Sequence, residues 1–119
     1  LVKHLLINWK EGEKHFRNCL LDYNEANNVS GWQWVAGCGA DAAPYFRIFN
    51  PILQGEKFDK EGDYVKKWVP ELKNVPKKFV HKPWEINDDN ILKLDKDYPR
   101  PIVNHEKARS KALEAFKKI

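Results

Sequence analysis

The sequence predicts an all-α domain that also carries long irregular surface segments. Apolar residues near both ends of the chain recur at intervals of three and four, which places them on one face of a helix. No segment alternates polar and apolar residues in the manner of a half-buried strand. The 119 residues suffice for one domain, which at this length can bury roughly two-thirds of the surface of the unfolded chain.

The composition is that of a globular protein, with 42% hydrophobic and 32% charged residues. This balance excludes a disordered chain, and no apolar run approaches the roughly 18 residues of a membrane helix, so we expect no membrane partner. The net charge of +4 is too small to identify a nucleic-acid partner by itself. Cys19 and Cys38 indicate reduced thiols in a cytoplasmic protein. The His residues are scattered, and no ligand spacing indicates a metal site.

The first part of the chain should contain two helices followed by a loop. Apolar spacing predicts one helix over residues 1–9 and a second over about residues 11–21. The Asp, Asn, Ser and Gly residues clustered in 22–31 compete with helix formation by bonding their own backbone. We therefore expect a turn and a binding loop there.

The middle of the chain carries mixed signals. Residues 32–35 suit either a short helix or an extended piece, and the glycines at 37 and 39 permit a tight turn. Asp41 is a candidate cap for a short helix over residues 44–49. The Asn-Pro pair at 50–51 should end that helix.

Charges and turn residues dominate positions 52–62. Asp63 can then cap a helix over residues 64–69, which Pro70 interrupts. We expect the apolar side of this helix to face the core. Its residues are Tyr64, Val65 and Trp68.

The last third of the chain combines an irregular segment with a helix. Residues 73–100 are aperiodic and should wrap over the helices, anchored by Phe79 and Trp84. Asn104 is a candidate cap for the final helix. Apolar residues of that helix recur at helical spacing, at positions 108, 112, 115, 116 and 119.

Residues 22–50 concentrate the side chains that can do chemistry. This segment holds several amides, two Trp separated by a single residue, three Gly and an Arg flanked by aromatics. An amide offers both a donor and an acceptor, and an aromatic ring can stack on a flat ligand. The segment therefore predicts a site for a flat heterocycle with polar edges.

The same segment resembles the flavin-binding helical domain of DNA photolyases and cryptochromes. The motifs that carry the resemblance are Asn27-Asn28-x-x-x-Trp32-Gln33-Trp34 and Gly39-Ala-Asp-Ala-Ala-Pro-Tyr-Phe-Arg-Ile-Phe-Asn-Pro51. Further matches follow in residues 54–59, 62–72, 81–84 and 98–103. The resemblance implies that residues 1–119 are the carboxyl-terminal part of the FAD-binding domain, with an antenna domain and the first part of the FAD domain upstream of Leu1.

The resemblance also implies roles for individual residues in electron transfer. Trp32 would lie nearest the flavin and Trp9 would be the next member of the tryptophan chain, while Asn28 would face the reactive edge of the ring. We expect these three side chains to converge on one flavin ring. From residue type alone, each Trp also fits a core position and the Asn pair also fits a turn.

By the same resemblance, the residues that contact the cofactor are Asp22, Tyr23, Asn24, Asn27, Asn28, Gly31 and Trp32. Asn24 departs from the family, which commonly has an acid there. Trp34 would stack on the DNA lesion, and Arg47 and Gln54 would face the DNA. By residue type, Arg47 also suits a structural ion pair.

The resemblance implies a class I cyclobutane pyrimidine dimer photolyase, in which light-excited reduced FAD donates an electron to a dimer flipped out of damaged DNA. The antenna chromophore would belong to the upstream domain, and the full-length protein would be a monomer. One alternative is a cryptochrome that uses the same pocket as a blue-light sensor. Another is a helical fragment without cofactor, and we expect the 119 residues alone to bind FAD weakly or not at all.

Overall fold

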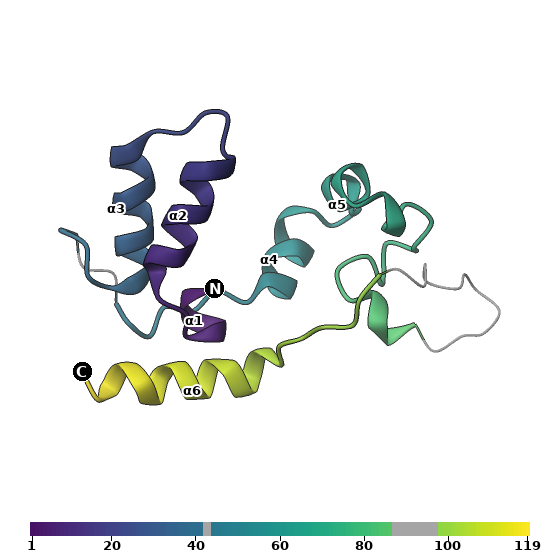
Figure 1. Cartoon of the computed structure of the whole chain (residues 1–119). Coiled ribbons are helices and arrows are strands. Elements are labelled where there is room, and N and C mark those ends of the chain that lie inside the picture. The colour runs from purple at the N-terminus through teal and green to yellow at the C-terminus, as the bar shows by residue number, and fades with distance from the viewer. Residues whose placement is uncertain (42–43, 87–97) are drawn as a thin grey trace. The chain divides into compact units, whose positions relative to one another are not determined.

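The computed structural model describes residues 1–41, 44–86 and 98–119, and within them the chain is helical without strands (Figure 1). The all-α prediction is confirmed. The elements are α1 (Val2–Leu5), α2 (Trp9–Cys19), α3 (Glu25–Ala36), α4 (Pro51–Phe58), α5 (Asp63–Trp68), the 3₁₀ turns η1 (Pro70–Leu72) and η2 (Pro83–Glu85), and α6 (His105–Lys117). They form two compact units, Leu1–Ile48 with Val103–Ile119, and Phe49–Ile102. No helix in the described ranges is long and apolar enough to cross a bilayer.

The helix expected over residues 1–9 is interrupted. Leu6 ends α1 in the left-handed conformation, with φ 53°, which L-residues avoid inside helices. Asn8 then caps α2, because its side-chain oxygen accepts the backbone N–H of Lys10 at 3.0 Å. Trp9 is therefore the first residue of α2 and not the last residue of the first helix.

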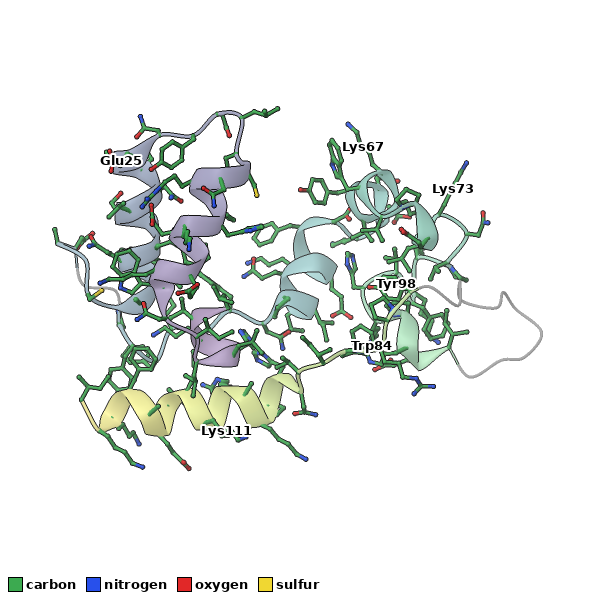
Figure 2. All side chains as sticks on the ribbon, in the orientation of Figure 1. Glu25, Lys67, Lys73, Trp84, Tyr98 and Lys111 are labelled. Carbon is green, nitrogen blue, oxygen red and sulfur yellow. The ribbon has the colours of Figure 1, made fainter. Side chains whose placement is uncertain are left out.

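The binding loop expected over residues 22–31 is mostly helix. The side-chain oxygen of Asn24 accepts the backbone N–H of Asn27 at 3.0 Å and so starts α3 directly after the loop of residues 20–24. Gly37 ends α3 as expected for a tight turn, with φ 74°. Figure 1 shows α2 and α3 side by side, and Figure 2 marks Glu25 at the start of α3. The amide-rich motif thus lies along a helix and not in a loop.

The short helix expected over residues 44–49 is also not observed. The backbone N–H of Arg47 donates to the carbonyl of Pro44 at 3.0 Å, which closes a turn. Asp41 caps no helix, and the two alanines that follow it lie outside the described residues. Asn50 begins α4 where we expected it to end a helix: its side-chain oxygen accepts two backbone N–H groups, and Pro51 occupies the first helical position.

In the second unit, the start of α5 is fixed by an acid other than the expected one. The carboxylate of Asp59 accepts the backbone N–H groups of Tyr64 and Val65, both at 3.2 Å, while Asp63 is already helical. The ring of His81 donates from Nε2 to the carbonyl of Asp59 at 2.7 Å. These bonds tie the start of α5 to the irregular segment.

The core of the second unit comes from η1 and that irregular segment. Its buried residues are Leu72, Val75, Val80 and Pro83. Phe79 and Trp84, the expected anchors, are only half-buried, and residues 87–97 of the expected wrap lie outside the described ranges. Tyr64 and Trp68 are 68% and 63% exposed, so the prediction that they face the core is wrong for this chain.

The final helix agrees with its prediction. Asn104 accepts the backbone N–H of Lys107 at 3.0 Å, and α6 buries Ala108 and Ala112 where it packs on α1. The ammonium of Lys3 lies 3.7 Å from the centre of the Phe116 ring and donates to the carbonyl of Tyr45 at 3.2 Å. Burial lowers the pKa of this lysine, so the ring and the carbonyl replace part of its lost hydration.

A pair of imidazoles also joins α1 to α6. His4 Nε2 and His105 Nδ1 lie 2.8 Å apart, a distance that requires one nitrogen to donate and the other to accept. Burial, the charge of His105 and the charge of the amino terminus lower the pKa of His4 below its usual 6.5. The folded state therefore resists protonation at this position.

This pair predicts a pH dependence of stability. The unfolded chain binds a proton at His4 more readily, so the stabilisation is complete well above pH 6.5 and is lost progressively as the pH falls below that value toward the lower pKa of the folded state. Thermal unfolding between pH 5 and 8 should show Tm falling by a few degrees on the acid side. His4→Asn should flatten that part of the profile, and an unchanged slope in the variant would contradict the assignment.

Candidate functional site

A hollow of about 490 Å³ lies between α2, α3 and the loop that joins them. Its lining residues are Phe16, Leu20, Asp22, Asn24, Asn27, Asn28, Gly31, Trp32 and Val35. All the residues expected to contact the cofactor are present in this set except Tyr23. Side chains from α2, from the loop of residues 20–24 and from α3 thus lie together around this hollow.

A hydrogen-bonded pair forms the polar part of this hollow. Asn28 and Trp32 are four residues apart on α3 and therefore share one face of the helix. The indole Nε1 of Trp32 donates to the side-chain oxygen of Asn28 at 3.1 Å. The Asn28 side-chain nitrogen donates to the backbone carbonyl of Glu13 at 3.0 Å and to its Oε1 at 3.4 Å. Both ends of the amide are therefore engaged, with the nitrogen toward α2.

Glu13 is a buried acid that sequence reasoning missed. It is 5% exposed, and Arg17, one turn later on α2, donates to both of its carboxylate oxygens at 2.7 Å. These hydrogen bonds and the acid's charge raise the pKa of Arg17. The spacing of four between an acid and an arginine was a readable signal of an ion pair on a helix.

Aromatic and aliphatic side chains form the walls. The rings of Phe16 and Trp32 meet edge to face, with centroids 5.1 Å apart and planes inclined by 72°. Gly12 lies under the Trp32 ring, where an added Cβ would collide with it. Gly31 differs, because a Cβ there would meet no atom within 4 Å. Gly12 thus serves the packing of the indole, whereas Gly31 leaves open space beside the hollow.

The rim of the hollow carries exposed polar groups. Asp22 and Asn27 are exposed and available to a ligand. The oxygen of Asn24 accepts the cap bond of α3, so its amide nitrogen and the second lone pair of that oxygen are the groups left for a contact with the cofactor. Tyr23 is half-buried and does not line the hollow.

Trp9 does not join Asn28 and Trp32 in this hollow. It lines a separate depression of about 460 Å³ together with Lys10, Lys14, Arg17 and Val29 among others. Of the three side chains expected to converge on one ring, Asn28 and Trp32 line the first hollow and Trp9 lines the second. Trp9 begins α2 and lies one turn before Glu13, on the same face of the helix.

The residues expected to face DNA lie in three different places. Trp34 lines a hollow of about 420 Å³ that also includes Gln33, Gly39 and Asp41. This hollow shares Asn27 and Gly31 with the first one. Arg47 is exposed in the turn that follows Pro44, and Gln54 is exposed on α4, which belongs to the other unit.

Comparison with known proteins identifies the family. A family model described as the FAD binding domain of DNA photolyase matches residues 1–118. The chain belongs to this family. A deoxyribodipyrimidine photo-lyase of Agrobacterium fabrum is 58% identical over 120 residues, which cover 98% of this chain and 25% of the relative. The chain thus spans about a quarter of the length of that photolyase.

Solved structures agree on the fold. The crystal structure of a bacterial class III photolyase from Agrobacterium tumefaciens matches with a TM-score of 0.89 and 56% identity, over 99% of this chain and 25% of the other. A Synechocystis cryptochrome matches with a TM-score of 0.82 and 36% identity, over 95% and 24%. This chain therefore has the helical fold of the corresponding part of these proteins.

The first hollow fits a flavin ring in its chemistry. Phe16, Leu20 and Val35 supply apolar walls for a flat ring, and the polar groups at the rim suit its edge. The open backbone at Gly31 lets a ring approach α3 closely. The described residues contain no group of three His, Cys, Asp or Glu that could hold a metal.

The two glycines beside the site predict opposite effects of the same mutation. Gly12→Ala should displace the Trp32 ring and lower the free energy of unfolding by about 1–3 kcal/mol. Gly31→Ala should raise it by up to about 1 kcal/mol through helix propensity while weakening flavin binding. Chemical denaturation followed by Trp fluorescence measures both. Equal effects on stability would contradict the packing role of Gly12.

The cap of α3 predicts a second matched pair. Asn24→Ala should cost about 1 kcal/mol of stability, because it leaves the backbone N–H of Asn27 without its acceptor. Asn24→Asp keeps an oxygen acceptor at the same position, so it should leave stability unchanged. Urea unfolding of the two variants beside the parent tests this. Loss of stability in the Asp variant would show that the amide nitrogen matters more than the cap.

Proposed function

We propose that this chain supplies the flavin-contacting helices of a photolyase that splits cyclobutane pyrimidine dimers in DNA. The observation that carries the proposal is the hydrogen bond from Trp32 to Asn28 inside the hollow between α2 and α3. It places an electron-rich indole and a neutral amide against the same ligand volume. Reduced FAD, when bound there, supplies the electron that opens the dimer.

The neutrality of Asn28 suits a reduced flavin. A carboxylate at this position would repel an anionic ring and would itself be driven toward protonation. The amide adds no charge, and its oxygen has a second lone pair beside the one that Trp32 occupies. Asn28 can therefore accept a hydrogen bond from a ring N–H.

Trp32 and Trp9 suit successive steps of an electron relay. Trp32 borders the hollow, whereas Trp9 lines a second depression together with Glu13. An indole can give up an electron without large atomic movement, since its charge is delocalised over the ring. In this arrangement Trp32 is the inner member of the relay and Trp9 the next one outward.

Trp34 and Arg47 suit the contact with damaged DNA. The hollow beside Trp34 shares Asn27 and Gly31 with the flavin hollow, so a base-sized group stacked on Trp34 would lie next to the cofactor. Enzymes that act on extruded bases commonly use such aromatic stacking. The exposed Arg47 and Gln54 suit contacts with phosphate oxygens.

The remaining features of the full-length protein follow the family. Both cysteines are free and exposed, which suits the reducing cytoplasm. We expect a monomer whose antenna chromophore binds to another domain. The class I assignment stays a prediction, because a class III photolyase has 56% identity to the chain.

Light-dependent repair tests the proposal. In the full-length protein loaded with reduced FAD, illumination should remove dimers from irradiated DNA, and the same mixture in the dark should not. Trp34→Ala should lose about 5- to 150-fold in dimer binding, because a stacked base contributes roughly 1–3 kcal/mol. Trp34→Phe keeps a flat ring and should retain most of it.

The same assay separates repair from signalling. A protein that binds flavin and is photoreduced, but leaves dimers intact in the light, would be a sensor of the cryptochrome kind. Failure of the 119-residue chain to bind FAD, alongside repair by the full-length protein, is the expected behaviour of a partial domain. Absence of flavin from the full-length protein would contradict the proposal.

A further inference from the structure

We propose that Glu13 is a positioning residue, which fixes the orientation of Asn28 so that the site presents an oxygen acceptor to its ligand. The inference deepens the proposed function, although its first test needs no flavin. The observation behind it is a buried acid whose hydrogen bonds reach the amide from the neighbouring helix.

The orientation of an amide depends on what lies at each end. Glu13 directs two oxygens at the Asn28 nitrogen, its backbone carbonyl at 3.0 Å and its Oε1 at 3.4 Å. Trp32 directs an N–H at the Asn28 oxygen, at 3.1 Å. A flipped amide would set oxygen against both oxygens of Glu13 and N–H against N–H at Trp32. Such buried mismatches are unfavourable, so only one orientation is satisfied.

The carboxylate itself is held in place by Arg17. The guanidinium donates from Nε and Nη2 to Oε1 of Glu13, and Nη2 also donates to Oε2. The acid is therefore neutralised on its exposed side, while the same Oε1 remains available to the amide. Asn28 has two N–H groups and Glu13 supplies one acceptor for each. Without the carboxylate, one buried N–H would lose its partner and the amide would be freer to turn.

The consequence concerns which ring the site prefers. With its nitrogen engaged by α2, Asn28 offers the hollow only the free lone pair of its oxygen. A ring that carries an N–H at the facing edge is favoured over one that carries a lone pair there. A reduced flavin has more N–H groups than an oxidised one, so Glu13 should favour the reduced cofactor through Asn28.

The test compares two replacements of Glu13 that differ in whether the side chain keeps an oxygen acceptor. Glu13→Gln and Glu13→Met both remove the charge and are similar in length, but only Gln keeps an oxygen for Asn28. In the protein without flavin, the Trp32 indole N–H is followed by NMR and assigned with Trp32→Phe. The Met variant should shift that resonance and speed its hydrogen exchange several-fold, and the Gln variant should remain near the parent.

A control separates positioning from simple loss of the ion pair. Arg17→Met removes the ion pair and keeps both acceptors of Glu13, so the Trp32 resonance should stay in place. A shift of the Trp32 resonance in Arg17→Met as large as that in Glu13→Met would overturn the proposal. The absence of any shift in Glu13→Met would also overturn it. If Glu13→Met does not fold, a shift in Glu13→Gln or Arg17→Met still overturns it, and their agreement with the parent supports it.

The full-length flavoprotein supplies the second readout. The midpoint potential of the bound flavin should fall in Glu13→Met relative to Glu13→Gln, since the reduced ring loses its oriented acceptor. Equal potentials would overturn the link to the cofactor. Failure of the parent to bind flavin would refute the proposed function and leave the NMR result on Asn28 standing, so the two failures are distinguishable.

Discussion

The arrangement of the site depends on one buried amide. Asn28 is 8% exposed and bonds α2 through its nitrogen and Trp32 through its oxygen. Leaving a buried polar group without a partner costs roughly 1–3 kcal/mol, so the register of α2 against α3 and the position of the indole are linked. The hollow takes its shape from that link. A shift of either helix by one residue would break the bond to Glu13, whereas the bond to Trp32 lies within α3 and would keep Asn28 and the indole together.

Local sequence signals account for some elements and not for others. The helix His105–Lys117 was predictable because its cap and its apolar repeat point to the same structure. The helix Glu25–Ala36 was not, because Asn27, Asn28 and Ser30 favour turns when judged singly. In the structure Asn24 takes over the role of cap, and Asn28 finds its partners on another helix. Tertiary hydrogen bonds override local propensity there.

The residues of the site were easier to predict than their geometry. The motif gave Asn28 and Trp32, but that they share a helix face follows only once residues 25–36 are known to be helical. Glu13 carries no local signal of function, since acids are common on solvent-exposed helices, and Gly12 indicates a close approach without indicating its partner. Their roles arise from what α3 places opposite them. Trp9 lies outside the hollow that Asn28 and Trp32 share, and the break at Leu6 makes it the first residue of α2.

The first unit has few buried apolar side chains to define its geometry. Those described are Val2, Ala108 and Ala112, and all lie where α1 and α6 pack. Between α2 and α3 the buried residues are Gly12, Glu13 and Asn28. Hydrogen bonds and close backbone approach therefore hold these two helices together in place of an apolar core. The atoms that would meet a ligand are thus the atoms that hold the helices. Binding and folding are coupled at this site, because a ligand that bonds the free lone pair of Asn28 reinforces the same contact that sets the helix register.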